Sequence, residues 1–149
     1  MALHRVSATK VIPAPAARVY ALLADYHEGH PSILPKPYFV SHTVEQGGRG
    51  AGSIVSFQMK LMGRTQRFRS AITEPEPGRV LVETVLTTGA VTTFTVEPSD
   101  DGQSAHVTIT TDTKVPGGIP GKVQGWMTTR LLRPIYVKEL EQLAAVVAR

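Results

Sequence analysis

A run of six strand-like segments joined by short turns constrains the fold of this chain more than any other feature. The segments alternate polar and apolar residues or are rich in threonine, and they cover residues 38–45, 53–61, 65–74, 79–87, 91–97 and 105–114. The links contain the glycine, proline and aspartate residues typical of tight turns, as in GGRGAG, EPEPG and PSDDG. Because links this short favour antiparallel neighbours, the pattern predicts an antiparallel meander.

One more strand and a helix are predicted before this run. Residues 3–12 alternate approximately between polar and apolar types, as a half-buried strand does. Pro15 suits the first turn of a helix, where its missing N–H is not needed. Apolar residues then follow at amphipathic helical spacing: Val19, Leu22, Leu23 and Tyr26. Residues 27–37 contain three prolines, which leave room only for a short helical turn before Pro35.

A long helix is predicted over residues 122–148, after a flexible glycine-rich lead-in that ends at Gly121. Its apolar positions form two faces, one with Val123, Met127 and Leu131 before Pro134 and one with Tyr136, Leu140, Leu143 and Val147 after it. Because proline removes a backbone hydrogen bond inside a helix, we expect a bend at Pro134. The two halves would then face different surfaces.

This order of elements predicts an α+β fold. A curved antiparallel sheet of about seven strands would wrap around the long C-terminal helix, with two short helices after the first strand. Because a strongly bent sheet cannot follow a straight helix closely, a gap between them would form a ligand cavity. No repeat or linker divides the chain, so we expect one domain over residues 1–149.

Composition excludes several classes of protein. Cysteine is absent, which removes disulfides and thiol nucleophiles, and no apolar run approaches the roughly 20 residues that span a bilayer. The first ten residues lack a signal-peptide core, so we expect a cytoplasmic protein without stable membrane insertion. The net charge of +4 is scattered and no nucleic-acid-binding module is present, which argues against a nucleic-acid partner. His27 and His30 are one residue too close for a zinc-protease helix, so no metal and no cofactor is predicted.

Several stretches together resemble the polyketide cyclase/dehydrase and lipid-transport superfamily (SRPBCC), which has the START-like or Bet v 1-like helix-grip fold. The stretches are VIPAPAARVYALLADY, Gly52 through Lys60 followed by Gly63-Arg64, EPEPGRVLVE and TTFTVEPSDDGQSAHVTIT. The resemblance implies a deep apolar cavity that binds lipids, sterols, quinones, polyketides or plant hormones. A minority of members catalyse cyclisation or dehydration. HEGHPSILP replaces the family's usual Trp-x-Pro context, so we expect a different cavity entrance, formed by His30 and Ile33.

Alternation along the central strands predicts which side chains form the cavity wall. The apolar set that should face the helix is Phe57, Met59, Phe68, Ser70, Phe94 and Val96. The alternative is that these residues form a solid core. On the helix, Trp126 and Met127 are expected to cap the same space. Arg130 either holds an anionic group of the ligand or extends past the helix edge to solvent.

No catalytic constellation is evident, because no serine nucleophile motif is present and Asp25 is expected to be a structural turn residue. Glu83 either points inward with Leu81 and Val85, where it could act as a base, or lies in water, which the pattern slightly favours. We therefore expect a protein that binds a small hydrophobic ligand. The alternatives are a polyketide cyclase, aromatase or dehydratase, and a protein-interaction module. The oligomeric state is left open.

Overall fold

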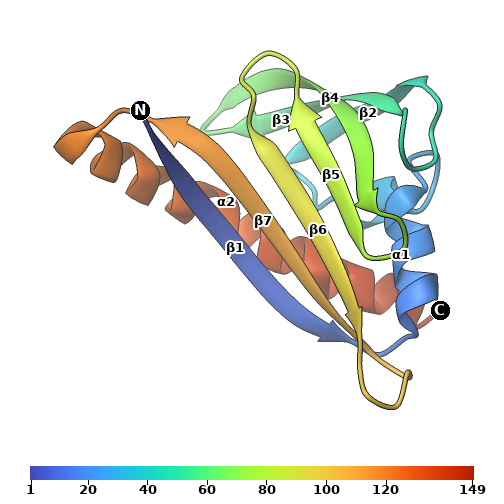
Figure 1. Cartoon of the computed structure of the whole chain (residues 1–149). Helices are drawn as coiled ribbons and strands as arrows, with labels where there is room; N and C mark the ends of the chain where they lie inside the picture. The colour runs from blue at the N-terminus through green and yellow to red at the C-terminus, as the bar shows by residue number, and fades with distance from the viewer.

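Seven antiparallel strands form a single sheet in the computed structural model, which describes residues 1–149 (Figure 1). The strands are β1 (Ala2–Ile12), β2 (Phe39–Gln46), β3 (Ile54–Leu61), β4 (Arg64–Glu76), β5 (Val80–Val85), β6 (Val91–Pro98) and β7 (Ala105–Val115). The helices are α1 (Ala16–Ala24), the short 3-10 helix η1 (His30–Ile33) and α2 (Gly118–Val147). The predicted sheet, the two short helices and the long C-terminal helix are confirmed. None of the helices is both long and apolar enough to cross a membrane.

The strand order is β1-β7-β6-β5-β4-β3-β2. The six strands of the central run therefore form the predicted meander, since each pairs with its neighbours in sequence. β1 lies beside β7 and pairs with it along its whole length, from Ala2 opposite Val115 to Ile12 opposite Ala105. This long pairing joins the two ends of the strand region and leaves β1 and β2 as the edges of the sheet.

The second half of α2 packs its large apolar residues into the core. Ile135, Leu140 and Leu143 are almost completely buried, together with Val19 and Leu23 of α1. Figure 1 shows α2 running across one face of the sheet, with α1 near its C-terminal end. Each fully buried side chain of this size contributes roughly 1.5–3 kcal/mol, so this contact holds the helix against the sheet.

The first half of α2 packs through glycines instead. Gly121 and Gly125 are its buried residues, and a Cβ built on Gly121 would lie 1.6 Å from the carbonyl oxygen of Pro116. A Cβ on Gly125 would lie 2.5 Å from Nδ1 of His4, a β1 residue whose Nε2 lies 2.7 Å from the Thr129 hydroxyl oxygen. The glycine-rich segment that was expected to be a flexible lead-in is thus the first part of the helix, which begins at Gly118.

Candidate functional site

A cavity of about 290 Å³ lies between the sheet and α2. Its wall comes from strands β2 to β7, from η1 and from α2. One end is apolar and includes three phenylalanine side chains, Phe39, Phe57 and Phe68. The ring centroids of Phe39 and Phe57 are 5.8 Å apart, and those of Phe57 and Phe68 are 5.5 Å apart. Rings at these distances form an aromatic cluster that favours flat or apolar ligands.

The register of β3 and β4 explains this aromatic end. Phe57 and Phe68 are directly opposite each other in the antiparallel pair, so their side chains project from the same face. Val55, Met59 and Leu61 alternate with polar residues on β3 and line the cavity as well. Alternation along these strands therefore predicts the inner face of this part of the sheet.

The structure brings together part of the predicted wall. Phe57, Met59, Phe68 and Phe94 line the cavity. Two other members of that set, Ser70 and Val96, are both fully buried but do not border it. The hydroxyl of Ser70 has no hydrogen-bond partner in the protein.

The predicted helix face is different in the structure. Trp126 is 61% exposed and Met127 is 49% exposed, and neither borders the cavity. Arg130 is also exposed, with its guanidinium carbon 5.0 Å from the centre of the Trp126 ring. The α2 residues that line the cavity are Gln124, Thr128, Leu131, Leu132, Tyr136 and Glu139. Gly121 lies against Pro116 and Gly125 lies against His4 of β1, so this side of the helix faces the protein and the larger residues Trp126 and Met127 point outward.

His30 and Ile33 are buried, and so they do not form an exposed entrance. Ile33 is completely buried in the core. The His30 ring stacks on Tyr26 at 4.6 Å and meets Phe94 edge-on at 5.1 Å. Its Nδ1 lies 2.8 Å from the carbonyl oxygen of Leu23, which can only accept, so Nδ1 carries a proton. This bond leaves Nε2 directed at the polar end of the cavity.

Glu83 is the centre of that polar end. The Tyr26 hydroxyl donates to Oε2 of Glu83 at 2.7 Å, and Nε2 of His30 is 3.5 Å from the same oxygen. Burial and the Glu83 charge raise the pKa of Tyr26 well above its ordinary value, so the phenol keeps the proton that it donates. The solvent-facing interpretation of Glu83 is therefore wrong, because Leu81, Glu83 and Val85 form the inward set of β5.

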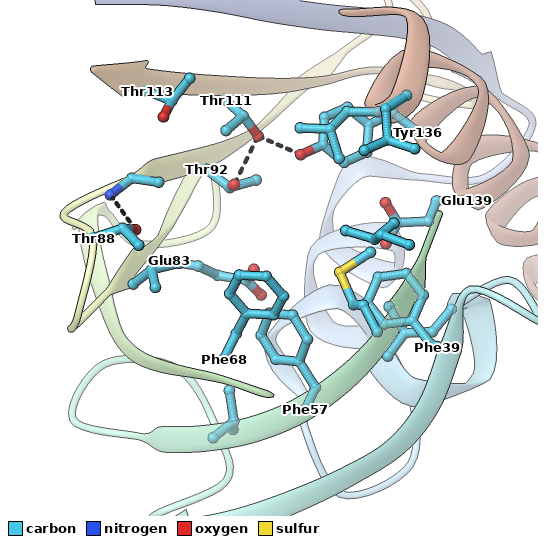
Figure 2. A pocket seen from close by; sticks show the side chains of 18 of the residues that line it. Phe39, Phe57, Phe68, Glu83, Thr88, Thr92, Thr111, Thr113, Tyr136 and Glu139 are labelled. Atoms are coloured by element: carbon cyan, nitrogen blue, oxygen red, sulfur yellow. Dashed lines mark hydrogen bonds between the residues drawn. The ribbon is translucent and has the colours of Figure 1, made fainter. Parts of the chain in front are cut away.

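A second carboxyl group faces the same space from α2. Glu139 is only 3% exposed and forms no hydrogen bond with another protein group. Burial first, and then repulsion from Glu83, raise the pKa of Glu139 well above its ordinary value. Figure 2 shows the carboxyl groups of Glu83 and Glu139 on opposite sides of the cavity. A protonated Glu139 can both donate and accept a hydrogen bond with a ligand.

Hydroxyl groups continue the polar surface along β6 and β7. The Tyr136 and Thr111 hydroxyl oxygens are 2.6 Å apart, and those of Thr111 and Thr92 are 2.7 Å apart (Figure 2). Burial raises the pKa of Tyr136 to about 12, so the phenol of Tyr136 stays uncharged near neutral pH. Among the lining residues there is no lysine or arginine. The polar end therefore contains the carboxyl groups of Glu83 and Glu139, the imidazoles of His30 and His42, and neutral hydroxyls.

A family comparison agrees with this architecture. The sequence model of the polyketide cyclase/dehydrase and lipid transport family matches residues 4–148. The chain belongs to this family. No curated protein matches the sequence at a significant level.

Solved structures place this family member among helix-grip proteins. The KanY protein is 25% identical, with a TM-score of 0.85 and complete coverage of both chains. A START superfamily protein from Mycobacterium smegmatis is 18% identical, with a TM-score of 0.76 and 97% coverage of each chain. The Zhui aromatase/cyclase from Streptomyces sp. R1128 is 18% identical, with a TM-score of 0.75 over 99% of this chain and 95% of that one. The last two likenesses support the fold alone.

Several polar residues of the cavity are not among those predicted from the sequence. Glu139 lies three residues after Tyr136 and four before Leu143, so an acidic residue stood within the predicted apolar stripe. That position was the available indication of a buried acid. Tyr26 was predicted only as a helix residue and His42 was not among the predicted site residues, although both border the cavity. Asp25 is the structural turn residue that was expected, because its carboxylate accepts from the backbone N–H groups of residues 27–29.

Proposed function

We propose that this protein binds a small hydrophobic molecule, such as a lipid, a quinone or a polyketide-like compound, in the cavity between the sheet and α2. The proposal rests on one observation, which is a cavity with an aromatic end and a polar end that contains Glu83 and Glu139 but no cationic lysine or arginine. The volume of about 290 Å³ is near the lower limit of small-molecule pockets, so the ligand is compact.

The polar end of the ligand is a hydrogen-bond donor. Glu83 accepts from Tyr26 and has a second oxygen available, and Glu139 has no partner within the protein. A ligand hydroxyl, phenol or amine would satisfy these groups, whereas a ligand carboxylate would face the Glu83 charge in a poorly hydrated space. The anionic ligand end considered for Arg130 is not part of this proposal, because Arg130 lies outside the cavity.

The first test is native mass spectrometry of freshly purified protein, followed by solvent extraction. We expect a retained adduct that is released on denaturation. A second assay measures displacement of the uncharged probe N-phenyl-1-naphthylamine by an alcohol, an amine and a carboxylic acid of equal chain length. We expect the alcohol and the amine to displace the probe at lower concentrations than the acid. Preference for the acid, or no probe binding, would contradict the proposal.

Two variants locate the polar end. Glu83→Gln and Glu139→Leu are expected to weaken alcohol and amine binding by about fivefold to 100-fold each, as expected for the loss of a hydrogen bond to a charged or buried group. Glu141→Gln is the matched control, because Glu141 lies on the same helix but is exposed. Equal affinities in all three variants would mean that the carboxyl groups do not contact the ligand.

A dehydratase or cyclase is the second candidate, and the pair of carboxyl groups supports it. An ionised Glu83 could remove a proton next to a carbonyl group, while a protonated Glu139 could donate its proton to a departing hydroxyl, which leaves as water. Turnover of a β-hydroxyketone or poly-β-ketone mimic, lost in Glu83→Gln and kept in Glu141→Gln, would support catalysis. Binding without turnover would leave the carrier proposal in place.

A further inference from the structure

An apolar patch lies outside the cavity, on the exposed side of the first half of α2 and on the turn between β3 and β4. We name it the outer patch, and its members are Met62, Ile119, Val123, Trp126 and Met127. Met62 is 78% exposed and Ile119 is 76% exposed. Met62 borders the same surface hollow as Val123, Trp126 and Met127, which brings the turn and the helix together. Clustered large apolar side chains of this kind mark an interaction surface more often than scattered ones do.

The fold does not need these side chains. In the first half of α2, Gly121 packs against Pro116 and Gly125 packs against His4 of β1, whereas Val123, Trp126 and Met127 make up part of its exposed side. Met62 has a backbone φ of 53°, in the left-handed region that residues other than glycine, asparagine and aspartate seldom adopt. A methionine in this position gains no burial in exchange for its strained backbone. These residue types therefore point to a contact outside the chain.

The sequence that carries the outer patch is basic. On α2 and the segment before it, no acidic residue occurs between Asp112 and Glu139 but five basic residues do, and one of them, Arg130, borders the same surface hollow as Trp126. Around the β3–β4 turn, no acidic residue occurs between Glu45 and Glu74, and Lys60, Arg64 and Arg67 are exposed. The partner of the outer patch must therefore offer negative charge next to an apolar phase.

The outer patch is continuous with the cavity wall. Gln124, Thr128 and Leu131 border both the internal cavity and the surface hollow that contains Trp126 and Arg130. The first turns of α2 also extend beyond the ends of β1 and β7 (Figure 1). A surface that touches the outer patch is therefore next to the part of the helix that closes the cavity.

We propose that the outer patch docks this protein on the surface of a bilayer that contains anionic lipids. Trp126, Met127 and Met62 would enter the interface between headgroups and acyl chains, and the surrounding lysines and arginines would contact the phosphates. The contact is peripheral, because only exposed side chains take part. A second copy of the chain fits the patch less well, since it would bring a like-charged surface into contact.

Trp126 reports this contact directly, because it is the only tryptophan in the chain and is 61% exposed. The assay measures its emission and the co-sedimentation of the protein with vesicles. Phosphatidylcholine vesicles that contain phosphatidylserine should shift the emission to shorter wavelength and bind the protein. Phosphatidylcholine alone should bind weakly, and added salt should release the protein because it screens exposed charges.

Variants separate the two parts of the contact. Each basic residue near an anionic surface strengthens binding about fivefold, so Arg130→Gln combined with Arg133→Gln should weaken vesicle binding about 25-fold. Met127→Ser combined with Met62→Ser should weaken it at least about tenfold, through the loss of inserted apolar area. Lys10→Gln and Val11→Ser are the matched controls, since both residues are exposed at the other end of β1. They should bind like the wild type.

Three results would overturn the proposal. The first is no binding to phosphatidylserine vesicles, and the second is an equal loss of binding in the Lys10→Gln control. The third is a shift of Trp126 emission that depends on protein concentration without vesicles, which would assign the outer patch to a second copy. Probe binding in the cavity is measured separately, so failure here is distinguishable from failure of the ligand-binding proposal.

Discussion

The two halves of α2 use opposite kinds of residue to contact the rest of the protein. Residues 118–133 bury Gly121 and Gly125 and expose Trp126 and Met127, whereas residues 135–147 bury Ile135, Leu140 and Leu143. The first half is placed by the close approach of its glycine backbone to Pro116 and His4, and the second half by the burial of large side chains. One continuous helix can therefore hold a core with one end while offering an apolar surface with the other.

The two halves should differ most in how much their large side chains stabilise the fold. Leu143→Ala in the second half should lower the free energy of unfolding by about 2–5 kcal/mol, because Leu143 is fully buried and its removal leaves a cavity. Urea denaturation measures this change. Val137→Ala on the same helix is the control, since Val137 is partly exposed, and its effect should be much smaller. A similar loss in both variants would mean that helix formation, and not packing, is being measured.

The glycine contact in the first half gives the second prediction. Gly121→Ala should lower the free energy of unfolding by about 1–3 kcal/mol, because its Cβ would lie 1.6 Å from the Pro116 oxygen and the backbone must move. Gly117→Ala is a matched control, since it has no heavy atom within 4 Å of its Cβ position and an ordinary φ of −70°. Thermal unfolding compares the two variants. Equal stability would show that the first turn of α2 can move away from Pro116 at little cost.

Glu139 allows a third comparison, because it is an acid within the apolar face of the second half. Its folded pKa is raised, so above the unfolded value of about 4.5 the folded state holds a proton that the unfolded state has lost. Stability therefore falls as pH rises, by up to about 1.4 kcal/mol per pH unit, until the folded pKa is reached. Glu139→Gln removes this loss.

We therefore expect Glu139→Gln to be more stable than the wild type at neutral pH, because the amide has no proton to lose. The difference should disappear near pH 4, where the carboxyl is protonated in both states. Urea denaturation at several pH values measures it, with the exposed Glu141→Gln as control. A variant that is less stable than the wild type at pH 7 would indicate that Glu139 is ionised and favourably paired in the folded state.

Local sequence patterns predicted the strands of this protein better than they predicted the side chains that face the cavity. Strand order follows from short links, and the inner face of β3 and β4 follows from alternation, so Phe57, Met59 and Phe68 were assigned to the cavity wall from local pattern. Strand alternation does not say which of two sets faces inward when both contain apolar residues. Glu83 was misplaced for this reason, because Val82 and Thr84 are as suitable for a core as Leu81 and Val85.

The prediction of which face of α2 points into the core was wrong for a different reason. An amphipathic pattern assigns the apolar stripe to the core, and Val123, Met127 and Leu131 form such a stripe. Glycine adds nothing to the stripe, although Gly121 lets the helix approach Pro116 and Gly125 lets it approach His4 of β1. The contact of Gly121 with Pro116 and that of Gly125 with His4 are visible only in the three-dimensional structure. His4 and Gly125 are also far apart in the sequence.

The smallest expected effect on stability belongs to the largest side chain of the first half. Trp126→Ala should change the free energy of unfolding by no more than about 0.5 kcal/mol, because Trp126 is 61% exposed and its main contact is with the exposed Arg130. Far-ultraviolet circular dichroism during urea denaturation measures this without tryptophan emission. A loss of several kcal/mol would mean that Trp126 is part of the core, and the outer patch would then lose its central residue. A small effect, together with the large effect of Leu143→Ala, would show that the exposed apolar residues of α2 serve contacts beyond the fold.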